Sequence, residues 1–304
     1  MTTRRHRRSA PIAIGLLIAV LAGCAAAVPQ PARPVPAPDR PAGVAATDCF
    51  PFERLPERLR SRARDLLLNA LDGEALYTIG ADLKPMSSGF YSVQIAVGNP
   101  DLREAEDVRQ VLEAWTCGGE LTATLHHFAA VYEGRRFLEG VVFNLPAMRQ
   151  LLERRAGFFA GYGVTRSADP LEALFAVEYD ATSARLRGYG YFFGYPDYAV
   201  DFFVKAADDQ NVTGTLVPRD FLSLPTARGE RRFVYATPKG HQPNEADAAL
   251  KAAVDRVFAD YMARRAKHIA GNDSSNVLAL VREWFDDGRG VVKPSNVWRT
   301  PVRR

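Results

Sequence analysis

The 304-residue chain contains 39 lysine and arginine residues against 35 aspartate and glutamate residues, a formal net charge of +4. Four of the arginines lie within residues 4–8, and without them 35 basic residues face 35 acidic ones. A nucleic-acid-binding protein presents a basic face, so this balance argues against a nucleic acid partner. An apolar content of 47% is enough for one large core, and we expect a single folded domain.

The first 23 residues have the parts of a secretory signal peptide. Residues 1–8 are cationic, residues 12–23 form an apolar run, and small residues precede Cys24. The run is shorter than the roughly 20 residues that a transmembrane helix needs, although a short uncleaved anchor is the alternative. We therefore expect residues 1–23 to be removed on export.

The segment Leu21-Ala22-Gly23-Cys24 resembles the lipobox of bacterial lipoprotein precursors at all four positions. The resemblance implies that the Cys24 thiol is acylated, that the peptide is cut before it and that the new amino terminus is acylated too. Two or more acyl chains give stable anchoring, so the implied partner is a membrane, held through Cys24. In Gram-negative lipoproteins the next residue influences sorting, and Ala25 implies the outer membrane, facing the periplasm.

Three further segments follow the predicted signal peptide. Residues 24–47 are rich in proline and alanine and predict an extended tether, residues 48–288 the folded domain, and residues 289–304 a basic tail. Acylation leaves two cysteines, Cys49 and Cys117. In an exported protein this pair predicts one disulfide, and two buried free thiols are the alternative.

Hydrophobic periodicity predicts an α+β domain in which amphipathic helices pack on a mainly antiparallel sheet. Helical spacing recurs in residues 54–71, 108–115, 145–152, 170–179, 196–204, 245–268 and 277–284. Strand patterns occupy residues 91–97, 121–132, 137–143, 222–224 and 233–236. Residues 133–134 predict a hairpin turn, residues 157–169 a connection, and residues 211–214 a turn.

Eight aromatic side chains fall within residues 189–203. The candidate ligand surface consists of the tyrosines Tyr189, Tyr191, Tyr195 and Tyr198, together with His126. Their apolar rings and polar tips suit a sugar ring or a lipid; alternatively the block is core, and its glycines permit close backbone packing. The pattern Gly, aromatic, aromatic, any residue, Gly, Tyr begins at both Gly157 and Gly190, but two copies do not establish a repeat architecture.

His126 and His127 are the best candidates for acid–base work. Adjacent strand residues point to opposite faces, so the two cannot chelate one ion in regular geometry. His126 shares a face with Thr122 and Thr124, which predicts a surface position, whereas His127 shares the apolar face and is expected in the core. We therefore expect neither a metal site nor a cofactor.

The sequence contains no Gly-x-Ser-x-Gly elbow, Ser-x-x-Lys, His-Glu-x-x-His or Walker loop. The sequence thus favours a lipoprotein that acts as a binding or envelope-structural module, with an envelope protein or polysaccharide as its partner. The alternative is a hydrolase acting on an envelope polysaccharide or lipid, with His126 or unrecognised carboxylates performing the chemistry.

Overall fold

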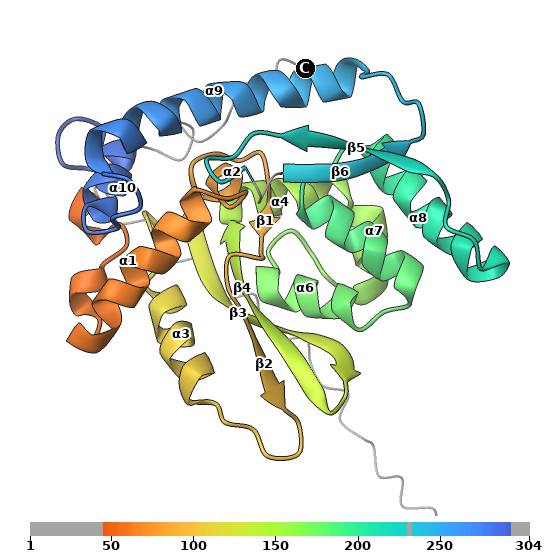
Figure 1. Ribbon diagram of the computed structural model, residues 1–304, viewed down its shortest axis with the longest axis horizontal. Coiled ribbons are helices and arrows are strands. Elements are labelled where there is room, and N and C mark those ends of the chain that lie inside the picture. Colours follow the sequence, from red (N-terminus) through yellow and green to blue (C-terminus); the bar gives the residue numbers. More distant parts are fainter. Residues whose placement is uncertain (1–44, 230–232, 293–304) are drawn as a thin grey trace, which may run out of the picture. The chain divides into compact units, whose positions relative to one another are not determined.

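Helices and antiparallel sheets form an α+β domain, seen in the computed structural model of Figure 1. The structure describes residues 45–229 and 233–292; the predicted signal peptide, Cys24, most of the tether and most of the basic tail lie outside them. The helices are α1 (Glu57–Leu71), α2 (Leu76–Ile79), α3 (Arg103–Glu113), α4 (Leu145–Arg154), α5 (Ala156–Phe159), α6 (Pro170–Glu178), α7 (Thr182–Phe192), α8 (Asp197–Thr213), α9 (Glu245–His268) and α10 (Val277–Phe285), with short 3-10 turns at Ala46–Asp48, Phe52–Arg54 and Ala160–Tyr162. The strands are β1 (Met86–Ser87), β2 (Ser92–Ala96), β3 (Leu121–Tyr132), β4 (Arg135–Asn144), β5 (Arg219–Leu224) and β6 (Phe233–Pro238).

Strand β4 is the centre of the main sheet. It pairs antiparallel with β3 on one edge and with both β1 and β2 on the other, while β5 and β6 form a separate antiparallel pair. The β3–β4 hairpin closes through Glu133 and Gly134, whose φ angles are 48° and 70°. Two consecutive positive φ angles are typical of the tight turns that suit the twist of a hairpin. The predicted hairpin is confirmed.

The main sheet divides the domain into two cores. Ala123 and Val142 on one face pack in a large core with residues of α1, α3, α9 and α10. Val141 and Phe143 on the other face pack in a second core with α4, α6 and α7. Figure 1 shows the same layers, with α1 and α3 on one side of β3 and β4 and α6 and α7 on the other. The side chains of β3 and β4 next to these helices are therefore covered on both faces, whereas the hairpin end, with Tyr132 and Phe137, is exposed.

The start of the domain is fastened to the segment that follows α3. The sulfur atoms of Cys49 and Cys117 lie at disulfide-bonding distance, 68 residues apart in sequence, as the cysteine count predicts. Beside them the Phe50 ring stacks on Phe285 of α10, with the ring centroids 6.4 Å apart. Among the described residues, no helix is both long enough and apolar enough to cross a membrane.

Two helices begin at an asparagine, a residue type that is strongly preferred as a helix cap. Asn144 accepts a hydrogen bond from the Ala147 backbone N–H at the start of α4 (3.0 Å). Asn244 and Asp247 exchange backbone and side-chain hydrogen bonds at the start of α9. Such caps satisfy N–H groups that the helix itself leaves unpaired, and they fix where α4 and α9 begin.

The glycine-rich segment 187–195, to which the sequence pattern assigns no helix or strand, belongs mostly to α7. A Cβ atom on Gly188 would lie 2.4 Å from Val177 of α6, and one on Gly190 would lie 2.7 Å from Val200 of α8. The glycines therefore mark helix crossings, as the close-packing interpretation expects. Helix α8 also continues to Thr213, so the turn predicted at residues 211–214 is wrong; the helix ends at Gly214 with φ 70°.

Candidate functional site

A pocket of about 230 Å³ opens where the end of α1 and the α1–α2 loop face the segment after β1. Its lining consists of Asn69, Ala70, Gly73, Glu74, Ala75, Ser88, Gly89 and Phe90. We call it the Glu74 pocket, because Glu74 is the ionisable residue of this lining. Asn69 and Ser88 supply neutral hydrogen-bonding groups, and Phe90 supplies an apolar wall.

The Glu74 carboxylate is held by a buried lysine. Lys84 Nζ donates to Glu74 Oε2 (2.6 Å), and the Lys84 side chain is fully buried whereas that of Glu74 is 25% exposed. The ammonium also lies over the rings of Phe193 and Phe233, at 5.0 and 4.5 Å from their centroids. Burial lowers the pKa of Lys84, and the attraction of Glu74 opposes this shift. Glu74 is the outward end of the pair and presents an oriented carboxylate to the pocket.

A second glutamate, Glu139 of β4, lies behind one wall of the pocket. The Ser88 side chain and the Gly89 backbone N–H donate hydrogen bonds to its carboxylate. Burial raises the pKa of Glu139, and the negative charge of Glu74 raises it further. Glu139 itself does not line the pocket. Through these hydrogen bonds its carboxylate supports the Ser88–Gly89 wall from the side of the sheet.

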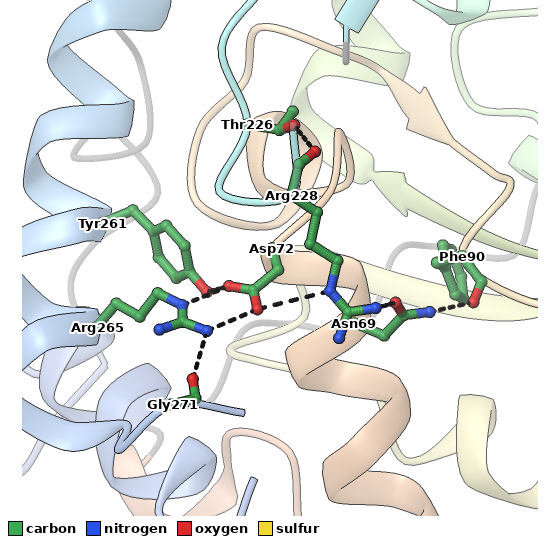
Figure 2. Close-up of polar contacts among 8 residues, drawn as sticks. All are labelled: Asn69, Asp72, Phe90, Thr226, Arg228, Tyr261, Arg265 and Gly271. Carbon is green, nitrogen blue, oxygen red and sulfur yellow. Dashed lines mark hydrogen bonds and ion pairs between the residues drawn. The ribbon is translucent and has the colours of Figure 1, made fainter. Parts of the chain in front are cut away.

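The opposite wall is fixed by the polar network drawn in Figure 2. Asn69 Nδ2 donates to the Phe90 carbonyl oxygen, and Arg228 Nη1 donates to Asn69 Oδ1, each over 2.6 Å. The Arg228 guanidinium in turn lies 3.8 Å from Asp72 Oδ2. Asn69 is thereby held from both ends of its amide, which orients the wall of the Glu74 pocket.

Asp72 connects this wall to α9, as Figure 2 shows. Its buried carboxylate accepts hydrogen bonds from the Tyr261 hydroxyl (2.6 Å) and from Arg265 Nε (2.7 Å) and Nη2 (3.0 Å). Burial and the nearby Asp72 charge raise the pKa of Tyr261, so this hydroxyl stays protonated and donates. The end of α1 is therefore attached to α9 next to the pocket.

The best acid–base candidate, His126, belongs to a buried chain of polar groups. Its Nε2 lies 3.0 Å from the Tyr189 hydroxyl oxygen, and that hydroxyl donates to Glu178 Oε2 (2.7 Å). Because tyrosine has one hydroxyl proton, His126 must donate its Nε2–H to Tyr189. Burial lowers the pKa of His126 to about 4, so it is neutral at pH 7. Its role here is to connect β3 with α6 and α7.

The predicted placement of the two histidines is wrong. His126 is buried, with 1% of its surface exposed, whereas His127 is only partly buried. The face that carries His126 is covered by α6 and α7, and both histidine rings contact Phe175 of α6 at 5.3 and 4.8 Å. The strand register shifts after His127, where strict alternation ends. Among the described residues no group of three or more His, Cys, Asp or Glu is placed to hold a metal ion.

The tyrosines of the candidate ligand surface have different surroundings. All four are partly buried: Tyr189, Tyr191, Tyr195 and Tyr198. The hydroxyls of Tyr189 and Tyr198 donate to the buried carboxylates of Glu178 and Asp247, at 2.7 and 2.5 Å. Tyr195 stacks on a core phenylalanine, and Tyr191 lies below an arginine guanidinium. Tyr189 therefore contacts His126, and the hydroxyls of Tyr189 and Tyr198 are used for hydrogen bonds to buried carboxylates inside the domain.

The sequence alone does not predict Glu74 or the residues that support its pocket. Glu74, Lys84 and Glu139 belong to no motif, and they come together only when the α1–α2 loop, the segment before β1 and strand β4 meet. A lysine inside the mostly apolar stretch 75–86 is the one local signal, since lysine is rarely buried without a partner. Comparison of the chain with protein-family models, curated proteins and solved structures finds no match.

Proposed function

We propose that the chain is a lipid-anchored protein of the bacterial outer membrane, facing the periplasm, whose domain binds a small polar ligand in the Glu74 pocket. The observation that carries the binding role is the ion pair in which the buried Lys84 holds the Glu74 carboxylate at the pocket. A fixed carboxylate accepts charge-assisted hydrogen bonds, which are about twice as strong as neutral ones. Hydroxyl-rich or amine-bearing ligands, such as a sugar unit of an envelope polysaccharide, meet this requirement.

The lining favours recognition over hydrolysis. Glycoside hydrolysis uses two carboxyl groups that flank the bond to be cut. Here Glu74 lines the pocket, whereas Glu139 lies behind the Ser88–Gly89 wall. Asn69 and Ser88 complement Glu74 with a donor and acceptor set, and Phe90 offers a face for the apolar side of a ring.

Titration of the mature protein with the β-linked disaccharide of N-acetylglucosamine tests the binding role. Glu74→Gln should weaken binding at least tenfold, because it removes the acceptor charge of one charge-assisted hydrogen bond. The matched control is Glu113→Gln on the exposed face of α3, which should bind as the wild type does. Equal affinities of the three proteins for the disaccharide would contradict the proposal for this ligand class.

Glu74→Gln leaves Lys84 without a charged partner, so a second variant separates binding from folding. The double variant Glu74→Met/Lys84→Met replaces the pair by apolar side chains of similar length, a change that is often neutral for stability. We expect it to fold and to lose the disaccharide. Retained binding by the folded double variant would show that the pair does not recognise the ligand.

A hydrolase remains the second candidate because burial and the Glu74 charge raise the pKa of Glu139. A carboxyl group with a raised pKa beside an ionised carboxylate is the arrangement of a general acid and its partner. Incubation of the mature protein with the disaccharide, followed by chromatography of the products, tests this candidate. Product that is lost in Glu139→Gln would establish hydrolysis, and an intact disaccharide would refute it for this substrate.

The anchor rests on the lipobox and is tested separately. We expect mass spectrometry of the membrane-purified protein to find acyl chains on Cys24, and Cys24→Ala to remain uncleaved. A free thiol at residue 24 in the membrane form would refute the anchor without affecting the pocket.

A further inference from the structure

A second hollow lies far along the chain from the Glu74 pocket, where the segment after α8 enters β5. It is a groove of about 470 Å³ lined by Leu216, Val217, Pro218, Arg219, Phe221 and Lys239. We call it the β5 groove. Its volume falls within the range of pockets that bind small molecules, roughly 300–1,000 Å³.

The walls of the β5 groove are apolar and exposed. Leu216 is 63% exposed and Phe221 is 64% exposed. Strand alternation explains Phe221: its neighbour Leu222 packs against the large core, so Phe221 points away from it. Large apolar side chains gathered around one hollow mark a binding surface more than scattered ones do.

Among the described residues, one cation of the β5 groove, Arg219, has no acidic partner at ion-pair distance. Arg219 is partly buried, its guanidinium lies 5.5 Å from the Phe203 ring centroid, and its Nε donates to the Val217 carbonyl oxygen. Its Nη2 is buried and has no hydrogen-bond partner within residues 45–229 and 233–292. Lys239 differs, because its ammonium is paired with Asp220 (2.6 Å). Within the part of the chain that the structure describes, the groove therefore carries one fixed positive charge without an ion-pair partner.

We infer that the β5 groove binds a single-chain anionic amphiphile, of the fatty acid or alkyl phosphate class. The acidic head group would compensate Arg219, since guanidinium groups bind carboxylates and phosphates through charge-assisted hydrogen bonds. The alkyl chain would cover Leu216 and Phe221, which removes their apolar surface from water. Both chemical requirements, an anion and an apolar chain, meet within this one groove.

Calorimetric titration with dodecyl phosphate below its micelle concentration tests the inference. The protein is the chain from residue 24 onward carrying Cys24→Ser, so that neither acyl chains nor detergent compete for the groove. We expect saturable binding, with Arg219→Gln and Phe221→Ser each weakening it at least tenfold. The controls are Arg135→Gln and Phe137→Ser on the β3–β4 hairpin, which remove an exposed arginine and an exposed phenylalanine away from the groove and should bind normally.

Each other outcome overturns the inference. Equal binding of dodecyltrimethylammonium would show that the charge of Arg219 does not select an anionic head group over a cationic one. Binding to vesicles of anionic phospholipid without binding of the monomeric amphiphile would identify a membrane-docking surface instead. A dimer that light scattering detects in the wild type and not in Phe221→Ser would assign the groove to a second copy of the chain. Since Phe221 and Arg219 lie near the surface, circular dichroism should show all variants folded.

Discussion

Replacing Asp72 by asparagine tests the network that joins α1 to α9. Asparagine keeps the shape of the side chain but removes its charge and turns one acceptor oxygen into an amide donor. That donor would face Tyr261 and Arg265, which themselves donate to the carboxylate in the wild type. We therefore expect Asp72→Asn to fold into the same structure with lower stability.

The size of the effect follows from the burial of the partners. Removing one member of a buried ion pair costs about 3–5 kcal/mol. Asp72 is 1% exposed, but Arg265 is 17% exposed and Arg228 is 40% exposed, so water can solvate part of the released positive charge. We expect a loss of about 2–3 kcal/mol in the free energy of unfolding. For a domain of this size that corresponds to a fall in Tm of roughly 4–12 °C.

Thermal unfolding followed by circular dichroism measures the change. The matched control is Asp101→Asn, which removes the carboxylate of an exposed pair with Arg103 and should leave Tm unchanged. Asp72→Asn should also loosen Asn69 through Arg228 and so weaken ligand binding in the Glu74 pocket. A Tm within 1 °C of the wild type would refute the view that this network supports the junction.

Three further changes test other parts of the fold. Burial lowers the pKa of His126 to about 4, so protonation favours the unfolded chain below pH 6.5. Thermal unfolding should therefore show that the free energy of unfolding falls by up to about 3 kcal/mol between pH 6.5 and 4. In His126→Gln this pH dependence should be smaller. Gly190→Ala should lower the free energy of unfolding by about 1–2 kcal/mol through overpacking against α8, as measured by chemical denaturation. Gly157→Ala, at the first position of the matching six-residue pattern, meets open space and should leave the free energy of unfolding unchanged. Replacing Cys49 and Cys117 by alanine should lower the free energy of unfolding by at most about 4 kcal/mol. Alkylation of the unreduced wild-type protein should add no mass, because both thiols are in the disulfide.

The elements that the sequence predicts well are those whose signals are local. The caps at Asn144 and Asn244, the turn at Glu133–Gly134 and the apolar stripe of α1 depend on residues a few positions apart. The sequence pattern does not indicate helix α7, because its glycines disfavour a helix in isolation. Its glycines are explained only by the valines of α6 and α8 that they admit, and those contacts depend on tertiary packing.

The histidine pair illustrates a different limit. Alternation along β3 predicts His126 and His127 on opposite faces, yet both rings contact Phe175 of α6 where the register shifts, and alternation does not reveal what covers each face. Helices α6 and α7 begin 38 and 50 residues after the end of β3, and they cover the face that Thr122 and Thr124 mark as polar. His126 is therefore buried on this face, and Tyr189, itself bonded to Glu178, supplies a hydrogen-bond partner for its Nε2.

The Glu74–Lys84 pair is better explained by recognition than by stability. A buried ion pair contributes little to stability, because the desolvation of its charges offsets their attraction, and apolar side chains of similar volume often serve the fold as well. Lys84 is fully buried among aromatic rings, and its attraction to Glu74 acts on a carboxylate that lines a pocket. An apolar pair could fill the same space but could not present an oriented charge to a ligand. The arrangement is therefore the one that a binding site needs, and a core built for stability alone does not require it.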